Sequence, residues 1–237
     1  MKKKAVALML SAVMAMGMVS AVSVQASVED KTLIVGFDAE YPPYGYMDEN
    51  GEYTGFDLEL AQEVAKRLGL EYKAQPIAWD SKDMELESGN IDCIWNGFTM
   101  TGREDDYTWS TPYMDNSQVF VVAADSGISS LADLAGKVVE VQTDSSAEAA
   151  LKDNAELSAT FGTLQTTPDY NTAFMDLEQG AVDAIAMDVI VAGYQIQQRN
   201  ADFKILDDSL SEEEYGVGSF HRAVRYRLQE GQHRVKR

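Results

Sequence analysis

The hydrophobic and polar positions of this chain alternate between a strand-like and a helix-like pattern from residue 31 to residue 218. Lys31–Phe37 (KTLIVGF) is apolar and rich in β-branched residues, which predicts a buried strand. Gly55–Leu68 predicts an amphipathic helix that ends at Gly69. The apolar face of this helix consists of Phe56, Leu60, Ala61, Val64 and Leu68.

The same alternation continues along the chain and predicts an α/β fold with two sheets. In the first half, we expect a strand at Leu70–Ala74, a helix around Ser81–Ser88 and a strand at Ile91–Trp95. Tyr113–Ala124 and Glu213–Gly218 predict two strands that carry the chain out of the first half and back to it. The elements expected between them are a short helix and turn at Leu131–Lys137, a strand at Val138–Val141 and helices from Ala147, from Thr167 to Gly180 and from Val189 to Arg199.

A short motif occurs twice without gaps. Glu87–Ile94 (ESGNIDCI) returns ninety-one residues later as Glu178–Ile185 (EQGAVDAI). Each copy predicts the end of a helix, a glycine turn and an apolar strand. Where the first copy continues to Gly97, the second continues to Asp188. The repeat indicates two similar lobes that hold a ligand between them.

We therefore predict four segments. They are a signal peptide at 1–26, lobe 1 at 27–119, lobe 2 at 120–213 and a return to lobe 1 at 214–237. The last segment becomes basic from Ser219 onward, with both histidines and one acid, unlike the residues before it. This change predicts an atypical and incomplete tail that arises from an altered or truncated reading frame; a genuine basic tail is the alternative.

The N-terminus has the pattern of an export signal. Lys2–Lys4 precede an apolar run, and Val24–Ala26 forms a small-x-small cleavage site. The protein is therefore expected in the periplasm or outside the cell, and an uncleaved membrane anchor is the alternative. Cys93 is the chain's single cysteine, which is expected to be a small buried hydrophobe.

Charge and residue types exclude several functions. Residues 31–210 hold ten Lys and Arg against thirty-three Asp and Glu, so phosphate-rich nucleic acid is not an expected partner. Both histidines lie in the tail, which removes imidazole-based catalysis and histidine zinc sites from the body. Neither common Gly-rich phosphate loop is present. We expect no cofactor and no metal.

The remaining candidates are polar residues at strand ends, where open α/β sheets bind ligands. Arg103 offers a planar cation for a carboxylate, or pairs with the acids that follow it. Asp188 could bind an ammonium group, or cap the next helix. Ser145 and Ser146 could hold an anion at a helix start, or act as ordinary caps.

Other candidates surround these charges. Tyr41 and Trp95 could form walls against a ligand side chain, although aromatic residues of α/β domains also serve as core. Asp38 could supply a second carboxylate or be a turn residue. The strand end at Asn96 and Gly97 exposes backbone amides, and Thr99 adds a hydroxyl.

Several motifs in order resemble the bacterial extracellular solute-binding proteins of polar amino-acid ABC transporters, the family of histidine-, arginine- and glutamine-binding proteins. The most specific motif is Gly55–Ala65 (GFDLELAQEVA), which is similar to the family's signature at its first helix. The other motifs are Asp38-x-x-Tyr41-x-Pro43-Tyr44, Gly97–Thr101 with Arg103, Val141-Gln142 with Ser145-Ser146, and Val182–Ile185 with Asp188.

The resemblance implies a two-lobed periplasmic-binding-protein clamp, in which each lobe is a mostly parallel sheet flanked by helices and two strands cross between lobes. It assigns the α-carboxylate of an amino acid to Arg103 and to groups near Thr99 and Ser145, and the α-ammonium to Asp188. It places Tyr41 against the side chain, and Asn96, Gly97, Gln142 and Ser146 complete the expected site. The implied partners are a polar amino acid and the permease of an ABC transporter, and the protein is expected to be a monomer.

The chain differs from the family's pattern at two positions, and two other functions are alternatives to a transport receptor. Arg103 lies one residue closer to Thr101 than the family's spacing implies, and Asp144 stands where members often have Gly. One alternative is a cyclohexadienyl or arogenate dehydratase-like enzyme, which needs a carboxylic acid in the cleft, with Glu40 or Asp144 as candidates. The other is a ligand-binding sensor domain with an uncleaved anchor.

Overall fold

The computed structural model describes residues 32–199 and 201–220. The predicted signal peptide and the predicted tail, apart from Ser219 and Phe220, lie outside the described residues. Within the described residues, no helix is both long and apolar enough to cross a bilayer.

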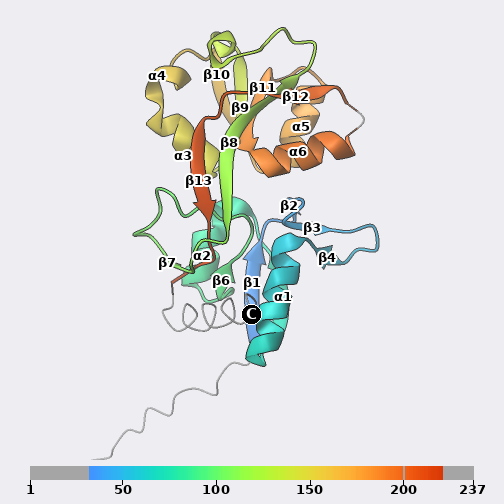
Figure 1. Ribbon diagram of the computed structural model, residues 1–237, viewed down its shortest axis with the longest axis vertical. Helices are drawn as coiled ribbons and strands as arrows, with labels where there is room; N and C mark the ends of the chain where they lie inside the picture. The colour runs from blue at the N-terminus through green and yellow to red at the C-terminus, as the bar shows by residue number, and fades with distance from the viewer. Residues whose placement is uncertain (1–31, 200, 221–237) are drawn as a thin grey trace, which may run out of the picture. The chain divides into compact units, whose positions relative to one another are not determined.

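Lobe 1 is built on a five-stranded sheet (Figure 1). The order is β5 (Glu71–Pro76), β1 (Thr32–Phe37), β6 (Cys93–Ile94), β14 (Gly218–Ser219) and β7 (Thr108–Trp109). β1 pairs in parallel with β5 and β6, whereas β14 pairs antiparallel with β6 and β7. The helical elements are α1 (Phe56–Leu68), η1 (Trp79–Ser81) and α2 (Lys82–Glu87), and a small sheet joins β2 (Glu40–Tyr41), β3 (Gly45–Met47) and β4 (Tyr53–Thr54).

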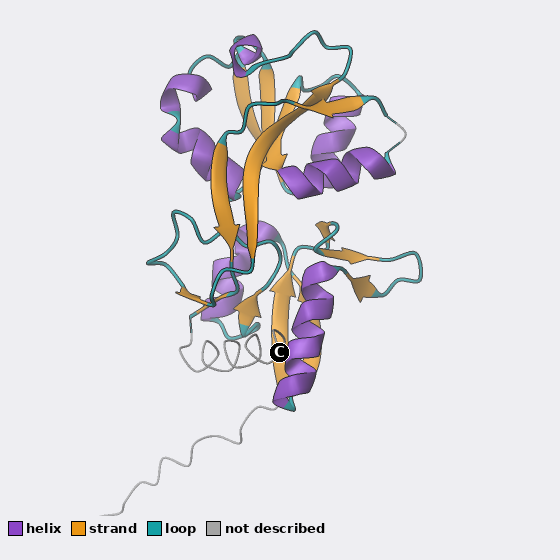
Figure 2. Cartoon of the chain, viewed as in Figure 1, coloured by secondary structure: helices purple, strands orange, loops and turns teal. Residues whose placement is uncertain are grey.

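Lobe 2 is built on a six-stranded mixed sheet with helices packed around it (Figure 2). The order is β10 (Thr163–Thr167), β9 (Val138–Gln142), β11 (Ala184–Asp188), β8 (Met114–Ala123) and β12 (Phe203–Ile205), with β13 (Ser211–Tyr215) also paired to β8. β9, β10 and β11 are parallel, and β8 runs against its partners. The helical elements are η2 (Leu131–Leu134), α3 (Ser146–Asp153), α4 (Ala155–Ser158), α5 (Tyr170–Glu178) and α6 (Val189–Gln198).

β8 and β13 connect the two lobes as an antiparallel pair, with Gln118 opposite Ser211 and Met114 opposite Tyr215 (Figure 1). These are the two predicted crossover strands, although the second begins at Ser211 and the chain pairs again at β14. The predicted lobe boundaries at residues 119 and 213 fall inside these strands and stay predictions.

The helix predicted at Gly55–Leu68 is α1, and its end follows the expected chemistry. Gly69 has a φ of 70°, and its N–H donates to the carbonyl of Lys66 at 3.2 Å. A left-handed residue at this position favours glycine, which lacks the Cβ that would clash. Arg67 pairs with Glu63 one turn earlier at 2.6 Å.

One residue that was predicted to lie on the buried face of this helix is exposed. Phe56 is 48% exposed, whereas Leu58, Ala61, Val64 and Ala65 are buried. Phe56 opens the first turn of α1, and its ring meets Tyr44 edge to face, with ring centroids 6.4 Å apart. Periodicity alone does not reveal where a helix leaves the surface against which it packs.

Candidate ligand cleft between the lobes

The carboxyl ends of β1, β6, β9 and β11 bring polar residues from both lobes to a small cavity. Its volume is about 10 Å³, enough for about one water molecule. A larger ligand therefore enters only when the lobes separate or lining side chains move. The lining residues are Tyr41, Trp79, Asn96, Gly97, Thr99, Arg103, Gln142, Ser145, Ser146 and Asp188.

Nine of the predicted site residues line this cavity, and Asp38 and Trp95 do not. Asp38 lies directly beside it: its carboxylate accepts from Gln142 Nε2 at 2.7 Å and from the Glu40 N–H at 2.8 Å. Burial raises the pKa of Asp38 to about 6, although both hydrogen bonds oppose this shift. Asp38 therefore contacts the cavity wall through Gln142.

The structure places Trp95 in the core of lobe 1 and not at the cavity. Trp95 is 0% exposed and packs in the same cluster as Cys93, which is also buried, as expected. Successive residues of a strand point to opposite faces, so Trp95 shares the α1 side of the sheet with Cys93, while Ile94 faces the other cluster. The predicted strand at Ile91–Trp95 is also shorter, at Cys93–Ile94.

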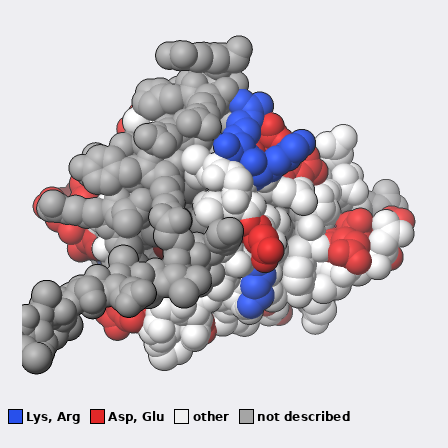
Figure 3. Space-filling model, turned by 90° about the horizontal axis from the view of Figure 1, so that it is seen from below, with Lys and Arg blue, Asp and Glu red and all other residues white. Residues whose placement is uncertain are grey.

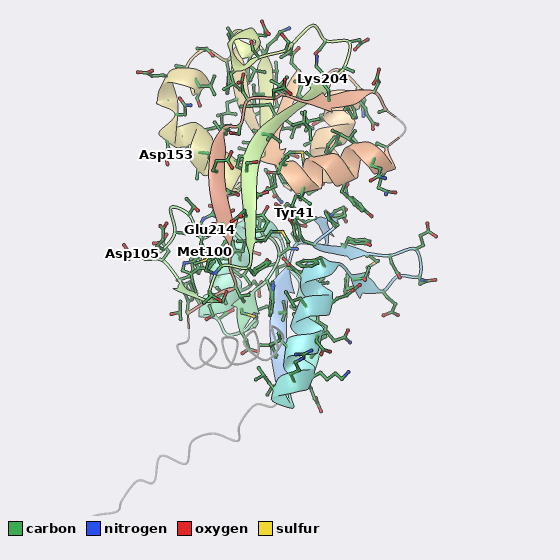
Figure 4. The ribbon with its side chains drawn as sticks, viewed as in Figure 1. Tyr41, Met100, Asp105, Asp153, Lys204 and Glu214 are labelled. Carbon is green, nitrogen blue, oxygen red and sulfur yellow. The ribbon has the colours of Figure 1, made fainter. Side chains whose placement is uncertain are left out.

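Arg103 lies at the lobe 1 side of the cavity. Its guanidinium donates to the carbonyl oxygens of Thr99 at 3.4 Å and Asp144 at 3.3 Å, and lies 5.4 Å from the ring centre of Phe98. Among the described residues, it forms no ion pair with the acids that follow it; Figure 4 shows Asp105, one of these acids, on the loop. Two long bonds to carbonyls leave a guanidinium with further donors for an anion.

Asp188 lies at the lobe 2 side, at the last position of β11 and immediately before α6. Its side chain makes no capping hydrogen bond to that helix. Instead Oδ1 accepts from Asn116 Nδ2 at 2.7 Å, Gln118 Nε2 at 2.8 Å and the Tyr215 hydroxyl at 2.5 Å. Burial raises the pKa of Asp188, and the hydrogen bonds from Tyr215 and Gln118 partly oppose the shift. The carboxylate is therefore held in the cleft by neutral donors.

The two serines at the start of α3 have different roles. Ser145 Oγ accepts from the Glu148 N–H at 3.1 Å, which is the ordinary capping bond. Ser146 Oγ instead faces lobe 1, where it lies 3.1 Å from the Thr99 hydroxyl. Both residues line the cavity, but only the Ser145 hydroxyl caps the helix.

Three residues of this region were not predicted from the sequence. Trp79 in η1 lines the cavity together with Tyr41, so it takes the place expected for Trp95. Lys82 of α2 is buried, lies 5.5 Å from the Trp79 ring centre and forms an ion pair with Asp144 of lobe 2. Glu213 of β13 is buried beside Thr99, whose hydroxyl donates to its Oε1 at 2.7 Å.

Hydrogen bonds and ion pairs join the rims of the cleft. Gln142 binds Asp38, Asn171 Nδ2 donates to Glu40, and Asp144 contacts both Lys82 and Arg103. Tyr41 and Tyr44 pack in one cluster with Tyr170 and Phe174 of α5. Figure 4 shows Tyr41 at this junction, with Met100 and Glu214 near the lower end of β13.

The described residues contain no group of three or more His, Cys, Asp or Glu side chains that could hold a metal ion. Glu40 and Asp144 are the two acids that were considered for an enzyme. Each is bound by a donor from the opposite lobe, Glu40 by Asn171 and Asp144 by Lys82.

On the face drawn in Figure 3, basic side chains lie directly beside acidic ones.

Comparisons with known proteins show the family and the fold. The chain is 32% identical over 220 residues to the L-cystine-binding protein TcyJ of Escherichia coli (strain K12), covering 88% of this chain and 81% of the relative. It is 33% identical over 188 residues to the arginine-binding extracellular protein ArtP of Bacillus subtilis (strain 168), covering 77% and 71%.

Among solved structures, the chain matches an ABC uptake transporter substrate binding protein from Streptococcus pneumoniae with bound histidine. The TM-score is 0.83 at 31% identity, and the match covers 87% of each chain. The two-lobed clamp expected from the sequence is therefore confirmed. Residues 33–204 match the profile of the bacterial extracellular solute-binding proteins, family 3, and the chain belongs to this family.

Proposed function

We propose that this protein binds a polar L-amino acid between its lobes and delivers it to the permease of an ABC transporter. The observation that carries the proposal is the placement of Arg103 and Asp188 in the lining of one cavity. An amino acid carries a carboxylate and an ammonium group on the same carbon. A binding site therefore needs a cation and an anion close together and shielded from water.

The roles follow from the contacts. Arg103 binds the α-carboxylate with the donors that its two backbone contacts leave available. The hydroxyls of Thr99 and Ser146 line the same cavity and donate to Glu213. Asp188 binds the α-ammonium. Tyr41 and Trp79 enclose the side chain, and Gln142 with Asp38 forms the wall beyond it.

Closure of the lobes over the ligand supplies the shielding and creates the surface that a permease recognises. The rim contacts of Asp38, Glu40 and Asp144 are those that form when the lobes meet. We place the protein in the periplasm or outside the cell, exported by its N-terminal signal, and acting as a monomer. The names of its relatives, which are binding proteins, favour a receptor over the enzyme alternative.

Calorimetric titration of the protein with L-arginine, L-cystine and L-histidine tests the proposal. These are the ligands in the names of its relatives. We expect one of them to bind at a single site, and Arg103→Ala to lose most of that affinity, because a shielded carboxylate would lose its cation. Glu104→Gln, which changes an exposed neighbour, is the matched control. No binding by a folded sample, or full affinity in Arg103→Ala, would contradict the proposal.

A further inference from the structure

Two buried carboxylates lie together at the ammonium side of the cleft. Asp188 ends β11 and is 2% exposed, and Glu213 in β13 is 7% exposed. We refer to Asp188 and Glu213 as the carboxylate pair. Glu213 does not belong to the site that was expected from the sequence, yet its Oε1 accepts a hydrogen bond from Thr99, which lines the cavity.

The same two amide groups donate to both carboxylates. Asn116 Nδ2 lies 2.7 Å from Asp188 Oδ1 and 2.6 Å from Glu213 Oε1. Gln118 Nε2 lies 2.8 Å from each of these atoms. An NH₂ group has two hydrogens, so each amide can direct one to each carboxylate. This bridging holds the two acidic groups side by side.

No cation neutralises the pair among the described residues. The groups that face it are neutral hydroxyls and amides: Thr99 and Ser146 at Glu213, Tyr215 at Asp188, and the two bridging amides. The titratable neighbours are Tyr41, Tyr170 and Tyr215, all buried. Arg103 binds backbone carbonyls, and Lys82 pairs with Asp144 and Asp83. The acids Glu212 and Glu214 flank Glu213 on the opposite, exposed face of β13.

Two buried like charges without a counterion do not both ionise, so the second carboxyl of such a pair retains its proton. Burial, followed by the charge of Asp188, raises the pKa of Glu213 to about 7. The bridged geometry and the lack of a cation lead to the same conclusion independently of this value.

We propose that Asp188 and Glu213 hold one proton between them, and that the α-ammonium of the amino acid displaces this proton to solvent when it binds. The inference rests on the proposed function and adds Glu213 to it as a second carboxylate for the ammonium. The step is balanced: one carboxyl O–H ionises, its proton passes to the buffer, and the ammonium keeps its own protons while it donates to the carboxylates. The pair then carries two negative charges beside one new positive charge.

The expected consequence is an affinity that rises with pH. With a Glu213 pKa of about 7, binding releases about 0.9 proton at pH 6 and about 0.1 at pH 8, and affinity increases roughly tenfold between these values. Asp38 and Asp57 also have raised pKa values, of about 6 and about 7, so a variant is needed to identify the source of the proton.

Calorimetry with L-arginine or L-cystine, in two buffers of different ionisation enthalpy at each pH, counts the released protons. Glu213→Gln keeps the shape and one acceptor oxygen but removes the titrating group. We expect this variant to release almost no proton, to bind with an affinity that is flat from pH 6 to 8, and to be at least tenfold weaker than the unmodified protein at pH 8. Glu214→Gln, the same change at the exposed neighbouring position, is expected to behave like the unmodified protein.

A carboxyl-carbon NMR titration without amino acid provides a second readout. We expect one glutamate side-chain signal to titrate near pH 7 and to disappear in Glu213→Gln. Proton release that persists in Glu213→Gln, or no release by the unmodified protein, overturns this inference while amino-acid binding stands. If L-arginine, L-cystine and L-histidine all fail to bind, the proposed function is overturned and the displacement step with it, and the NMR titration alone then decides whether the pair shares a proton.

Discussion

The repeated segments Glu87–Ile94 and Glu178–Ile185 build the same structure in the two lobes. In lobe 1, Asp92 donates its N–H to the Ile34 carbonyl at 2.8 Å and accepts the Ile34 N–H on Oδ2 at 2.7 Å. In lobe 2, Asp183 makes the same two bonds with Val138, both at 2.8 Å. In each lobe this aspartate attaches the repeated strand to a neighbouring parallel strand.

The turns before these strands also agree. Gly89 and Gly180 have φ angles of 73° and 69°. The residue after each glycine donates its N–H back into the helix, from Asn90 to Glu85 at 3.0 Å and from Ala181 to Asp176 at 2.9 Å. These bonds satisfy carbonyls at a helix end, and they need a left-handed glycine.

The two copies of the repeat diverge after the shared motif. In lobe 1, Gly97 turns with a φ of 57°, and its N–H donates to the buried Asp57 at 2.5 Å. At the equivalent position in lobe 2, Asp188 keeps an ordinary φ of −65° and directs a carboxylate into the cleft. The comparison teaches that shared hydrogen bonds position the repeated strand, and that the residue three positions beyond the shared motif, Gly97 or Asp188, determines the chemistry offered to a ligand.

The largest effect is expected at this position in lobe 2. Asp188→Asn should weaken amino-acid binding about a hundredfold, which corresponds to ~3 kcal/mol, because the ammonium loses its charged partner. Asp183→Asn is the matched control, since the same change earlier in the repeat removes a charge outside the cleft and leaves an acceptor for the Val138 N–H. Isothermal titration calorimetry measures both. Equal losses in the two variants would show that Asp188 has no special role.

The next effect concerns the glycine at the equivalent position in lobe 1. A Cβ on Gly97 would lie 3.0 Å from Tyr41 Cε1 and 3.2 Å from Tyr215 Cε2, in addition to the cost of its positive φ. We expect Gly97→Ala to lower the free energy of unfolding by ~2–3 kcal/mol. Gly102→Ala has a φ of 79° but open space around it, so it should cost only ~1 kcal/mol. Urea unfolding that gives the same value for both would exclude the contact with the tyrosines.

A smaller effect tests the equivalence of the lobes. Asp92→Ala and Asp183→Ala each leave a partly buried N–H, of Ile34 or Val138, without its acceptor. We expect each change to cost ~1–2 kcal/mol in urea unfolding. Asp183 also lies 3.5 Å from Lys137, but this pair is exposed and should add little. A loss of unfolding free energy in only one variant would show that the two copies of the repeat share a structure but that their aspartates do not stabilise the fold equally.

The smallest effect concerns the contact that joins the two lobes at Asp144. This residue has a positive φ of 59°, which asparagine tolerates well, so Asp144→Asn removes the charge without straining the backbone. Lys82 then loses its nearest carboxylate, and we expect affinity to fall about fivefold, or ~1 kcal/mol. Asp153→Asn, at an exposed position of α3, is the control. Small-angle scattering of Asp144→Asn should show a larger share of open molecules, and an unchanged profile would contradict a role in closure.

Much of the fold was predictable because it depends on neighbours in the chain. Three sequence signals correspond to observed elements: the apolar, β-branched run at Thr32–Phe37, the helical period after Gly55 and the stop at Gly69. The repeat predicted two equivalent units. The position of Phe56 was wrong, because the extent of the surface that a helix covers is a tertiary property.

The sequence predicted those residues of the site that lie at the converging ends of strands. Tyr41, Arg103, Gln142 and Asp188 were predicted from the strand ends and family motifs, and the structure brings them to one cavity. Glu213 had only a weak signal: it opens the predicted strand Glu213–Gly218 between two further acids, and alternation along the observed β13 turns it inward. Trp79 and Lys82 gave no comparable signal.

The sequence by itself therefore determined the main helices and central strands, the paired lobes and the positions where polar groups leave the sheets, because hydrophobic period, glycine turns and repeated motifs act over a few residues. It did not predict β2, β3, β4, β7, β10 and β12. Only the tertiary structure decided which of those groups face each other. Trp95 packs in the core of lobe 1 and Trp79 lines the cavity, because the two residues lie on different sides of the sheet. Asp188 became a cleft carboxylate, not a helix cap, because Asn116, Gln118 and Tyr215 reach it from distant parts of the chain.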